Sequence, residues 1–129
     1  MLEITNASKT FFPGTVNEVK ALQRVNLSVD NGSFTAIIGT NGSGKSTLLN
    51  AIAGTFIPDE GVVRVDGNDI TRWKEYQRAR LIGRVFQNPF AGTAAEMTIA
   101  ENIVMAMRRG QMRSLKTAVT GTVKEEIAD

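Results

Sequence analysis

A glycine-rich loop at residues 39–46, which reads GTNGSGKS, constrains this chain more than any other part of its sequence. The loop matches the phosphate-binding pattern G-x-x-x-x-G-K-[ST] at every fixed position. The apolar segment 34–38 precedes it and reads as a buried strand, while residues 46–53 read as a helix that Gly54 would cap. A strand, a phosphate loop and a helix in this order are typical of nucleotide-binding α/β proteins.

The residue types of the loop suit a triphosphate. Glycines let the backbone curl around the phosphates with its N–H groups pointing inward, and the start of a helix adds a positive dipole end. Lys45 can place its ammonium against the β- and γ-phosphates, and the Ser46 hydroxyl can ligate Mg²⁺. We therefore expect the nucleotide to be bound by Gly39, Thr40, Asn41, Gly42, Ser43, Gly44, Lys45, Ser46 and Thr47.

Composition places the chain among ordinary globular proteins and excludes several kinds of site. Apolar residues make up 42% and charged residues 22% of the 129 residues, a length that suits one domain. The chain has no Cys and no His, so disulfides, thiol–zinc sites and histidine-based catalysis are excluded. A net charge of +2 is too small to indicate nucleic-acid binding, and we expect neither a signal peptide nor a membrane span.

Hydrophobic periodicity predicts the other elements of the chain. Alternating apolar and polar residues indicate strands at residues 2–5, 21–29, 61–65 and 81–86. Helices are expected at residues 73–80, with Thr71 as N-cap, and at residues 99–109, where Thr98 and Glu101 have the spacing of a capping box. The tail from residue 114 to residue 129 is weakly helical.

The sequence around the loop discriminates among phosphate-loop proteins. A GTPase would need the strings N-K-x-D and D-x-x-G, and neither occurs here. Several segments, taken in order, closely resemble the N-terminal half of an ABC transporter ATP-binding subunit: residues 8–11, 21–29, 32–39, 46–54, 58–70, 85–89 and 98–103. The resemblance covers about residues 1–110.

This resemblance implies a fold and two cofactors. The fold would be α/β, a P-loop NTPase core with an N-terminal antiparallel β subdomain, incomplete at the C-terminus. Residues 1–96 would form the nucleotide-binding core and the β subdomain, and residues 97–129 would begin the helical subdomain. The cofactors that the resemblance implies are ATP and Mg²⁺.

The resemblance also assigns roles to single residues. Phe11 stands where the family places an aromatic side chain that stacks on adenine, and Phe12 beside it is its rival for that role. Gln87 stands where the family's glutamine touches Mg²⁺ and the attacking water, and an amide offers an acceptor and two donors for both tasks. Lys45 and Gln87 are therefore the expected catalytic residues, and Ser46 and Gln87 the expected metal ligands.

Three elements of the family do not occur in this sequence. They are the L-S-G-G-Q signature, a Walker B strand that ends in Asp-Glu, and the switch histidine. Asp66 with Gly67 reads as a hairpin turn instead of a Mg²⁺ carboxylate, because Arg64 interrupts the apolar run before it. We expect the chain to be an N-terminal fragment of a transport ATPase that binds ATP at most and hydrolyses it slowly or not at all.

The resemblance implies partners at the cytoplasmic face of the cell membrane: transmembrane permease subunits, a second ATP-binding subunit and a solute-binding receptor, with no nucleic acid. The length of the stretch 88–96 favours import. A basic run close to several methionines reads as either a solvated helix face or a docking surface; it comprises Arg108, Arg109, Arg113 and Lys116. Two alternatives stay open: a soluble ABC-type ATPase acting on the ribosome or nucleic acid, and a P-loop small-molecule kinase.

Overall fold

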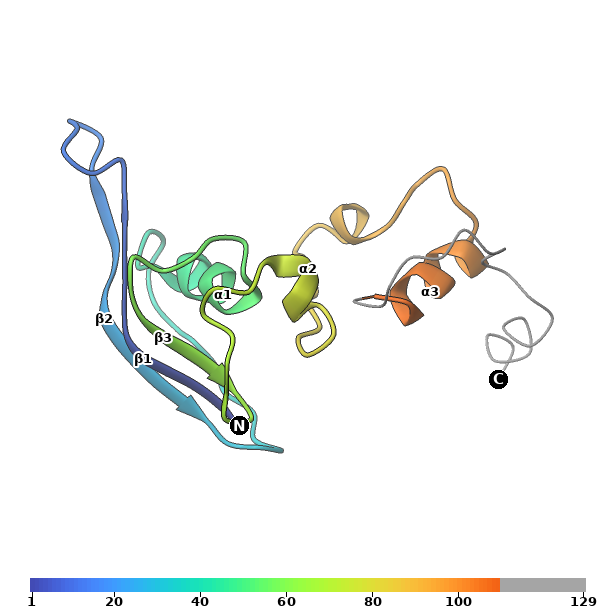
Figure 1. Ribbon diagram of the computed structural model, residues 1–129. Helices are drawn as coiled ribbons and strands as arrows, with labels where there is room; N and C mark the ends of the chain where they lie inside the picture. Colours follow the sequence, from blue (N-terminus) through green and yellow to red (C-terminus); the bar gives the residue numbers. More distant parts are fainter. Residues whose placement is uncertain (110–129) are drawn as a thin grey trace. The chain divides into compact units, whose positions relative to one another are not determined.

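The computed structural model describes residues 1–109. The chain divides into two compact units, of which the first comprises Met1–Leu81 and the second begins at Ile82. Figure 1 shows the elements of each unit, coloured along the chain. The weakly helical tail expected at residues 114–129 lies outside the described residues.

The first unit is built on an antiparallel sheet with the strand order β2-β1-β3-β4. Its strands are β1 (Leu2–Phe11), β2 (Val19–Val29), β3 (Glu60–Val65) and β4 (Asn68–Asp69). β1 is longer than the expected strand at residues 2–5, whereas the expected strands at residues 21–29 and 61–65 are confirmed. Asp66 and Gly67 connect β3 to β4 with φ angles of 49° and 77°, which confirms the predicted hairpin turn.

The long strand β1 bends where its pairing shifts register. Its register against β2 shifts between Ile4 and Ala7, and Asn6 there has a φ of 50°. On its other edge, Gly61 has a φ of 91°, and a Cβ atom at Gly61 would lie 2.5 Å from the carbonyl oxygens of Thr5 and Asn6. Because only glycine permits this approach, β3 can follow β1 through the bend.

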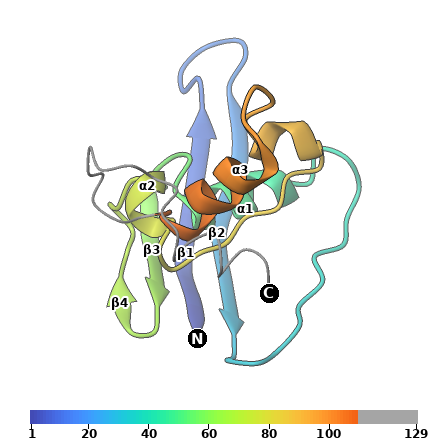
Figure 2. The same ribbon diagram turned by 90° about the vertical axis from the view of Figure 1, so that its right-hand side faces the viewer.

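Helix α1 (Lys45–Ala53) packs on one face of this sheet and closes the core of the first unit (Figure 2). The buried core contains Leu48 and Ala51 from the helix, with Ile4, Ala7 and Leu22 from the strands. Gly54 follows the helix with a φ of 85° and donates to the Asn50 carbonyl oxygen at 3.0 Å. The predicted helix and its glycine cap are both confirmed.

Two of the expected strands are wrong. Residues 34–38 and 81–86 belong to no strand, and the side chains of Phe34, Ile38 and Val85 are 94%, 93% and 97% exposed. An apolar strand of the buried kind is stable only when hydrogen-bonding neighbours flank it on the sheet. Within residues 1–109, no strand of the structure pairs with either segment.

The predicted helix at residues 73–80 is shorter than expected. Helix α2 comprises Glu75–Arg78 and has Lys74 as its N-cap. Thr71 does not cap it, because the Thr71 hydroxyl instead donates to Asp69 Oδ1 at 2.6 Å and accepts from the Val63 N–H at 2.9 Å. Its side chain therefore ties the segment after β4 back to β3.

The second unit contains the 3₁₀ helix η1 (Pro89–Gly92) and helix α3 (Ile99–Met107). The capping box of α3 is confirmed: Thr98 Oγ1 accepts from the Glu101 N–H, and Glu101 Oε2 accepts from the Thr98 N–H at 2.8 Å. The Asn102 amide holds the segment before α3, since its Oδ1 accepts from the Ala94 N–H at 2.8 Å and its Nδ2 donates to the Ala94 carbonyl oxygen at 3.1 Å.

In the first unit, Asp59 joins the segment before β3 to the end of β1. Its Oδ1 accepts from the Lys9 ammonium at 2.7 Å, and its Oδ2 accepts from the Thr10 N–H at 2.8 Å. These two hydrogen bonds, the one from Lys9 first, hold the pKa of the Asp59 carboxyl below its ordinary value of 3.8. Asp59 is therefore more stable as a carboxylate in the folded chain than in the unfolded chain.

We expect Asp59→Asn to lower the free energy of unfolding by about 0.5–1 kcal/mol near pH 6, because the pair is partly exposed to solvent. Since the folded pKa is depressed, this stability is present above the unfolded pKa of 3.8 and is lost as pH falls through the folded value. Urea denaturation at several pH values measures it. The control Asp30→Asn changes an exposed turn residue, and an Asp59→Asn deficit of constant size down to pH 2 would contradict the assignment.

Candidate functional site

The phosphate loop leads directly into helix α1, and the start of this helix has no side-chain cap. Gly44 is its N-cap residue, and the first turn holds no acidic side chain. The first N–H groups of a helix have no intrahelical partner, and the dipole makes this end partially positive. The nine-residue helix therefore presents free donors and positive potential at the loop, which suits an anionic ligand.

Gly44 holds the loop against the sheet. Its φ is 88°, and a Cβ atom at this position would lie 2.6 Å from the backbone oxygen of Ala21 in β2. No larger residue fits without moving the strand or the loop. The second fixed glycine of the sequence pattern is thus required by packing as well as by backbone conformation.

Lys45 folds back over the loop. Its ammonium donates to the carbonyl oxygens of Gly39 at 2.8 Å and Thr40 at 2.7 Å, and to Ser43 Oγ at 3.4 Å. The side chain therefore already lies over the concave side of the loop, where phosphate oxygens would be its competing acceptors. The predicted loop residues and Lys45 are brought together in the first unit.

The other polar groups of the loop are open to solvent. Ser46 is exposed and Thr47 is half-buried in the first turn of α1. Asn41 and Ser43 are exposed, and the Ser43 N–H donates to the Thr40 carbonyl oxygen at 3.2 Å in a tight turn. The Ser46 hydroxyl can therefore reach a cation that accompanies a bound phosphate.

The two candidate aromatic residues for base stacking differ in their surroundings. Phe11 is half-buried and meets Phe56 edge to face, with ring centroids 5.4 Å apart and planes at 87°. The Lys9 ammonium lies 5.7 Å from the centroid of Phe11 and 5.6 Å from that of Phe56. Phe12 is 66% exposed and starts the turn to Thr15, whose N–H donates to its carbonyl oxygen. Phe11 is the anchored ring and Phe12 the exposed one.

Gln87 belongs to the second unit. Its side chain is exposed, and it follows Phe86, whose ring centroid lies 4.7 Å from the Arg84 guanidinium carbon. Asn88 then accepts from the Phe90 N–H at 3.0 Å and caps η1. The candidate residues thus come from both units: the phosphate loop and Phe11 from the first, and Gln87 from the second.

No group of three or more His, Cys, Asp or Glu side chains suited to hold a metal ion occurs within residues 1–109. Asp66, in its hairpin turn, accepts from the N-terminal amine at 2.5 Å. Protein ligands for Mg²⁺ would therefore be few, as is common when phosphates supply other ligands.

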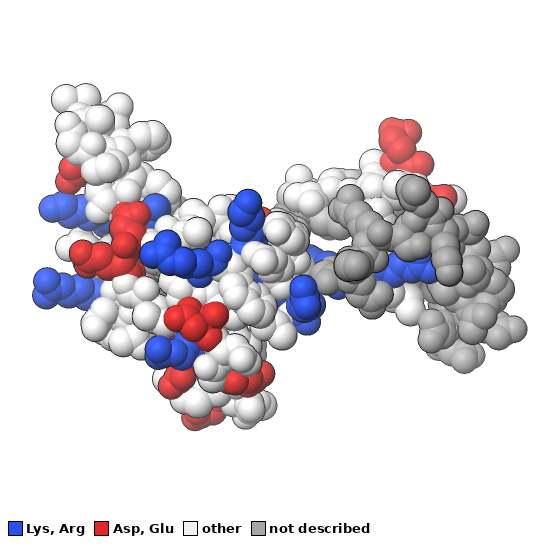
Figure 3. Space-filling model, in the orientation of Figure 1, with Lys and Arg blue, Asp and Glu red and all other residues white. Residues whose placement is uncertain are grey.

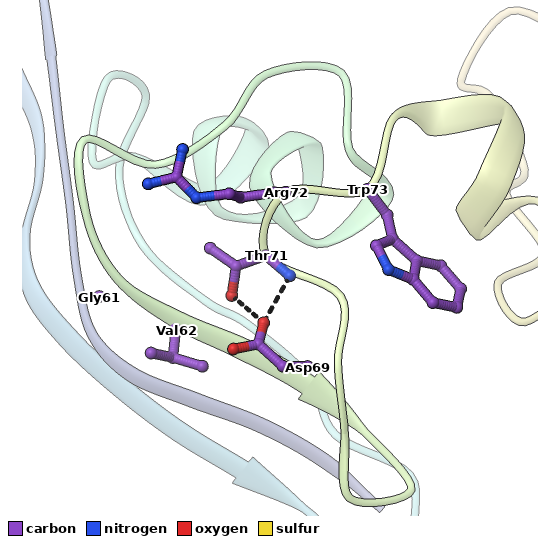
Figure 4. A pocket seen from close by; sticks show the side chains of 6 residues that line it. All are labelled: Gly61, Val62, Asp69, Thr71, Arg72 and Trp73. Atoms are coloured by element: carbon purple, nitrogen blue, oxygen red, sulfur yellow. Dashed lines mark hydrogen bonds between the residues drawn. The ribbon is translucent and has the colours of Figure 1, made fainter.

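A separate hollow of about 450 Å³ lies beside β3 (Figure 4). Its polar centre is Asp69, whose Oδ1 accepts from the hydroxyl and the N–H of Thr71 at 2.6 and 2.9 Å. These hydrogen bonds lower the pKa of the Asp69 carboxyl. Arg72 and Trp73 point away from each other at its rim (Figure 4), and none of its lining residues belongs to the phosphate loop.

Charge is mixed on the face of the first unit shown in Figure 3, where basic and acidic side chains alternate. In the second unit, Arg108 and Arg109 are exposed after α3. The other two members of the predicted basic run, Arg113 and Lys116, lie outside the described residues. The candidate docking surface is therefore described only in part.

The sequence interpretation missed two contributors to the site. Phe56 supports Phe11, and Arg78 is buried against the end of α1. Nothing in a single sequence separates Arg78 from the exposed Arg72 and Arg80 near it, because burial of an arginine depends on which carbonyl groups the fold brings to it. The edge-to-face ring pair likewise joins residues far apart in the chain.

The sequence is similar to those of known proteins. The family model described as "ABC transporter" matches residues 22–128. The tyrosine transport ATP-binding protein of Clostridioides difficile is 40% identical over 117 residues, which cover 90% of this chain and 46% of that protein. The probable branched-chain amino acid transport ATP-binding protein LivG of Archaeoglobus fulgidus is 44% identical over 107 residues, which cover 82% of this chain and 39% of that protein.

The fold is also similar to solved structures. A dimeric structure of the ATP-binding cassette MJ0796 bound to ADP and Pi matches with a TM-score of 0.77 and 29% identity, over 99% of this chain and 54% of that chain. The chain spans about half the length of the proteins it matches. These matches confirm the predicted P-loop NTPase fold. Among residues 1–109, no helix has the length and apolar character that a bilayer crossing requires.

We expect Gly44→Ala to destabilise the chain more than Gly42→Ala does. Both positions have positive φ angles, of 88° and 82°, so alanine is strained by about 1–2 kcal/mol at either. Only at Gly44 would the new Cβ atom also collide with the Ala21 oxygen, while nothing lies within 4 Å at Gly42. Overpacking adds about 1–3 kcal/mol. Thermal unfolding followed by circular dichroism measures both, and equal losses would contradict the packing role of Gly44.

Proposed function

The chain belongs to the ABC transporter family, and we propose that its phosphate loop binds Mg-ATP for a subunit that powers solute transport through a membrane partner. The observation that carries this proposal is the uncapped start of α1, with the Lys45 ammonium held over the loop. Free N–H donors and a fixed cation are what a triphosphate needs from a protein.

Each residue of the site has a proposed role in ATP binding. The backbone N–H groups from Gly39 to Thr47 surround the phosphates, and Lys45 exchanges its loop carbonyl partners for β- and γ-phosphate oxygens. Ser46 supplies a hydroxyl ligand to Mg²⁺, which neutralises charge on the phosphates when bound. Phe11, anchored by Phe56, provides a face for adenine.

For hydrolysis we propose that the Gln87 amide orients the attacking water and contacts Mg²⁺, as the family resemblance implies. Its exposed side chain is accessible to such partners. A Walker B Asp-Glu, the signature sequence and a histidine do not occur in these 129 residues. We therefore propose that this chain alone hydrolyses ATP slowly or not at all, and that hydrolysis belongs to a complete subunit.

The proposed partners are transmembrane permease subunits, a second ATP-binding subunit and a solute-binding receptor, at the cytoplasmic face of the membrane. The names of the relatives support transport of small solutes, since they include tyrosine and branched-chain amino acid transport proteins. Another relative, from Chlorella vulgaris, is named a probable sulfate/thiosulfate import protein. Exposed apolar side chains on α3 support docking to a partner; they are Ile99, Met105 and Met107.

Titration of Mg-ATP into the 129-residue chain should show saturable binding by calorimetry. We expect Lys45→Ala to weaken it at least tenfold, because a charge-assisted hydrogen bond contributes about 1.5–3 kcal/mol. Lys20→Ala, at an exposed position of β2, is the matched control and should bind as the unchanged chain does. Equal affinities in all three proteins would contradict a role of the phosphate loop.

The base-stacking role is tested by Phe11→Leu and Phe12→Leu. We expect Phe11→Leu to weaken Mg-ATP binding at least fivefold, since stacking of a base contributes about 1–3 kcal/mol. It should leave the binding of Mg-tripolyphosphate, which has no base, unchanged. Phe12→Leu should change neither affinity. The reverse pattern would transfer the role to the exposed ring of Phe12.

A further inference from the structure

Arg78 is the only charged side chain within residues 1–109 that is fully buried, with 0% exposure. Every nitrogen of its guanidinium donates to a backbone carbonyl oxygen. Nη1 contacts the oxygens of Ala51 and Ile52, both at 2.7 Å. Nη2 donates to the Thr71 oxygen at 2.8 Å, and Nε donates to the Trp73 oxygen at 3.0 Å. One side chain thus joins two segments that are far apart in the sequence.

Two of these oxygens belong to the last turn of α1. The final carbonyl groups of a helix have no intrahelical donor, and they form the negative end of its dipole. The Asn50 oxygen accepts from the N–H groups of Gly54 and Thr55, both at 3.0 Å. Arg78 serves the next two carbonyl oxygens, so it completes the cap with a positive charge.

Gly54 lets Arg78 reach this position. A Cβ atom at Gly54 would lie 2.9 Å from both Cδ and Nε of Arg78, and 3.2 Å from the Glu75 nitrogen. The arginine therefore lies directly against the end of the helix, with no room for an intervening side chain. The contact is fixed by shape as well as by charge.

Burying the Arg78 guanidinium costs more free energy than burying an apolar side chain of similar volume would. Burial lowers the pKa of Arg78, and the Asp69 charge opposes that effect. No acidic side chain within residues 1–109 forms an ion pair with Arg78. The four carbonyl oxygens are therefore the partners that compensate the buried charge, so loss of any of these hydrogen bonds is costly.

The opposite end of α1 is the phosphate loop. The helix has nine residues and is therefore about 13 Å long. A tilt of about 5° at its C-terminal end displaces its N-terminal end by about 1 Å, which is enough to misplace a ligand-binding group. Whatever holds the C-terminal end consequently controls where Lys45 and the first N–H groups lie.

We propose that Arg78 is a positioning residue for the nucleotide: it fixes the C-terminal end of α1, so that the other end presents Lys45 and the loop N–H groups in a geometry that fits phosphates. The inference rests on the proposed function of the loop. Arg78 does not contact the nucleotide, and it acts on binding only through the helix.

The test uses Arg78→Lys in the 129-residue chain, because lysine keeps the charge and loses the fork that reaches four oxygens. We expect the hydrogen-bonded backbone amides of α1 and its cap, residues 48–54, to exchange hydrogen at least tenfold faster, while the amides of β1 and β3 keep their rates. Arg80→Lys, at an exposed position two residues away, is the matched control and should change neither. Unchanged exchange at residues 48–54 would overturn the proposal, whether or not the chain binds ATP.

Calorimetry with Mg-ATP then separates positioning from loss of stability. Val63→Ala removes buried volume from β3, outside the core cluster that contains Leu48 and Ala51 of α1, so it supplies a destabilised reference. At a temperature where every variant is folded by circular dichroism, Arg78→Lys should bind at least fivefold more weakly and Val63→Ala as the unchanged chain does. Equal affinity in Arg78→Lys, or an equal loss in Val63→Ala, would overturn the proposal. Absence of binding in the unchanged chain would instead refute the proposed function.

Discussion

The position of helix α1 is the constraint on which the rest of the first unit depends. Leu48 and Ala51 attach its middle to the core of the sheet, and Gly44 rests its start against β2. Arg78 holds its end through two carbonyl oxygens. A helix attached along its whole length has little freedom to tilt or slide. The end of the loop that joins this helix is therefore fixed in position. The conformation of the loop itself is then set by its glycines and by the Lys45 hydrogen bonds to its carbonyl oxygens.

Features set by neighbouring residues were predictable from the sequence, and features set by distant ones were not. The phosphate loop, the turn at Asp66 and the capping box of Thr98 need only local partners, and their patterns indicate them directly. Residues 34–38 have the composition of a buried strand but no neighbour to pair with among the described residues. The burial of Arg78 could not be predicted for the same reason, because its hydrogen-bond partners are carbonyl groups of other segments.

In each unit, one side chain hydrogen-bonds to several backbone groups at helix ends or in irregular segments. In the first, the Arg78 guanidinium serves four carbonyl oxygens. In the second, the Asn102 amide serves the N–H and the carbonyl of Ala94, and also the carbonyls of Met97 and Thr98. Backbone groups outside helices and strands need partners as much as those inside them do. A side chain with several hydrogen-bonding groups provides these partners without adding a strand or a turn.

The three contacts of the Lys45 ammonium have a consequence for ligand exchange. With Gly39, Thr40 and Ser43 as acceptors, the cation is already satisfied before any ligand arrives. In the proposed function, capture of a phosphate would be an exchange of acceptors, and departure of a phosphate would return the ammonium to the carbonyl groups it left. Neither step of this proposed exchange would leave the ammonium without an acceptor.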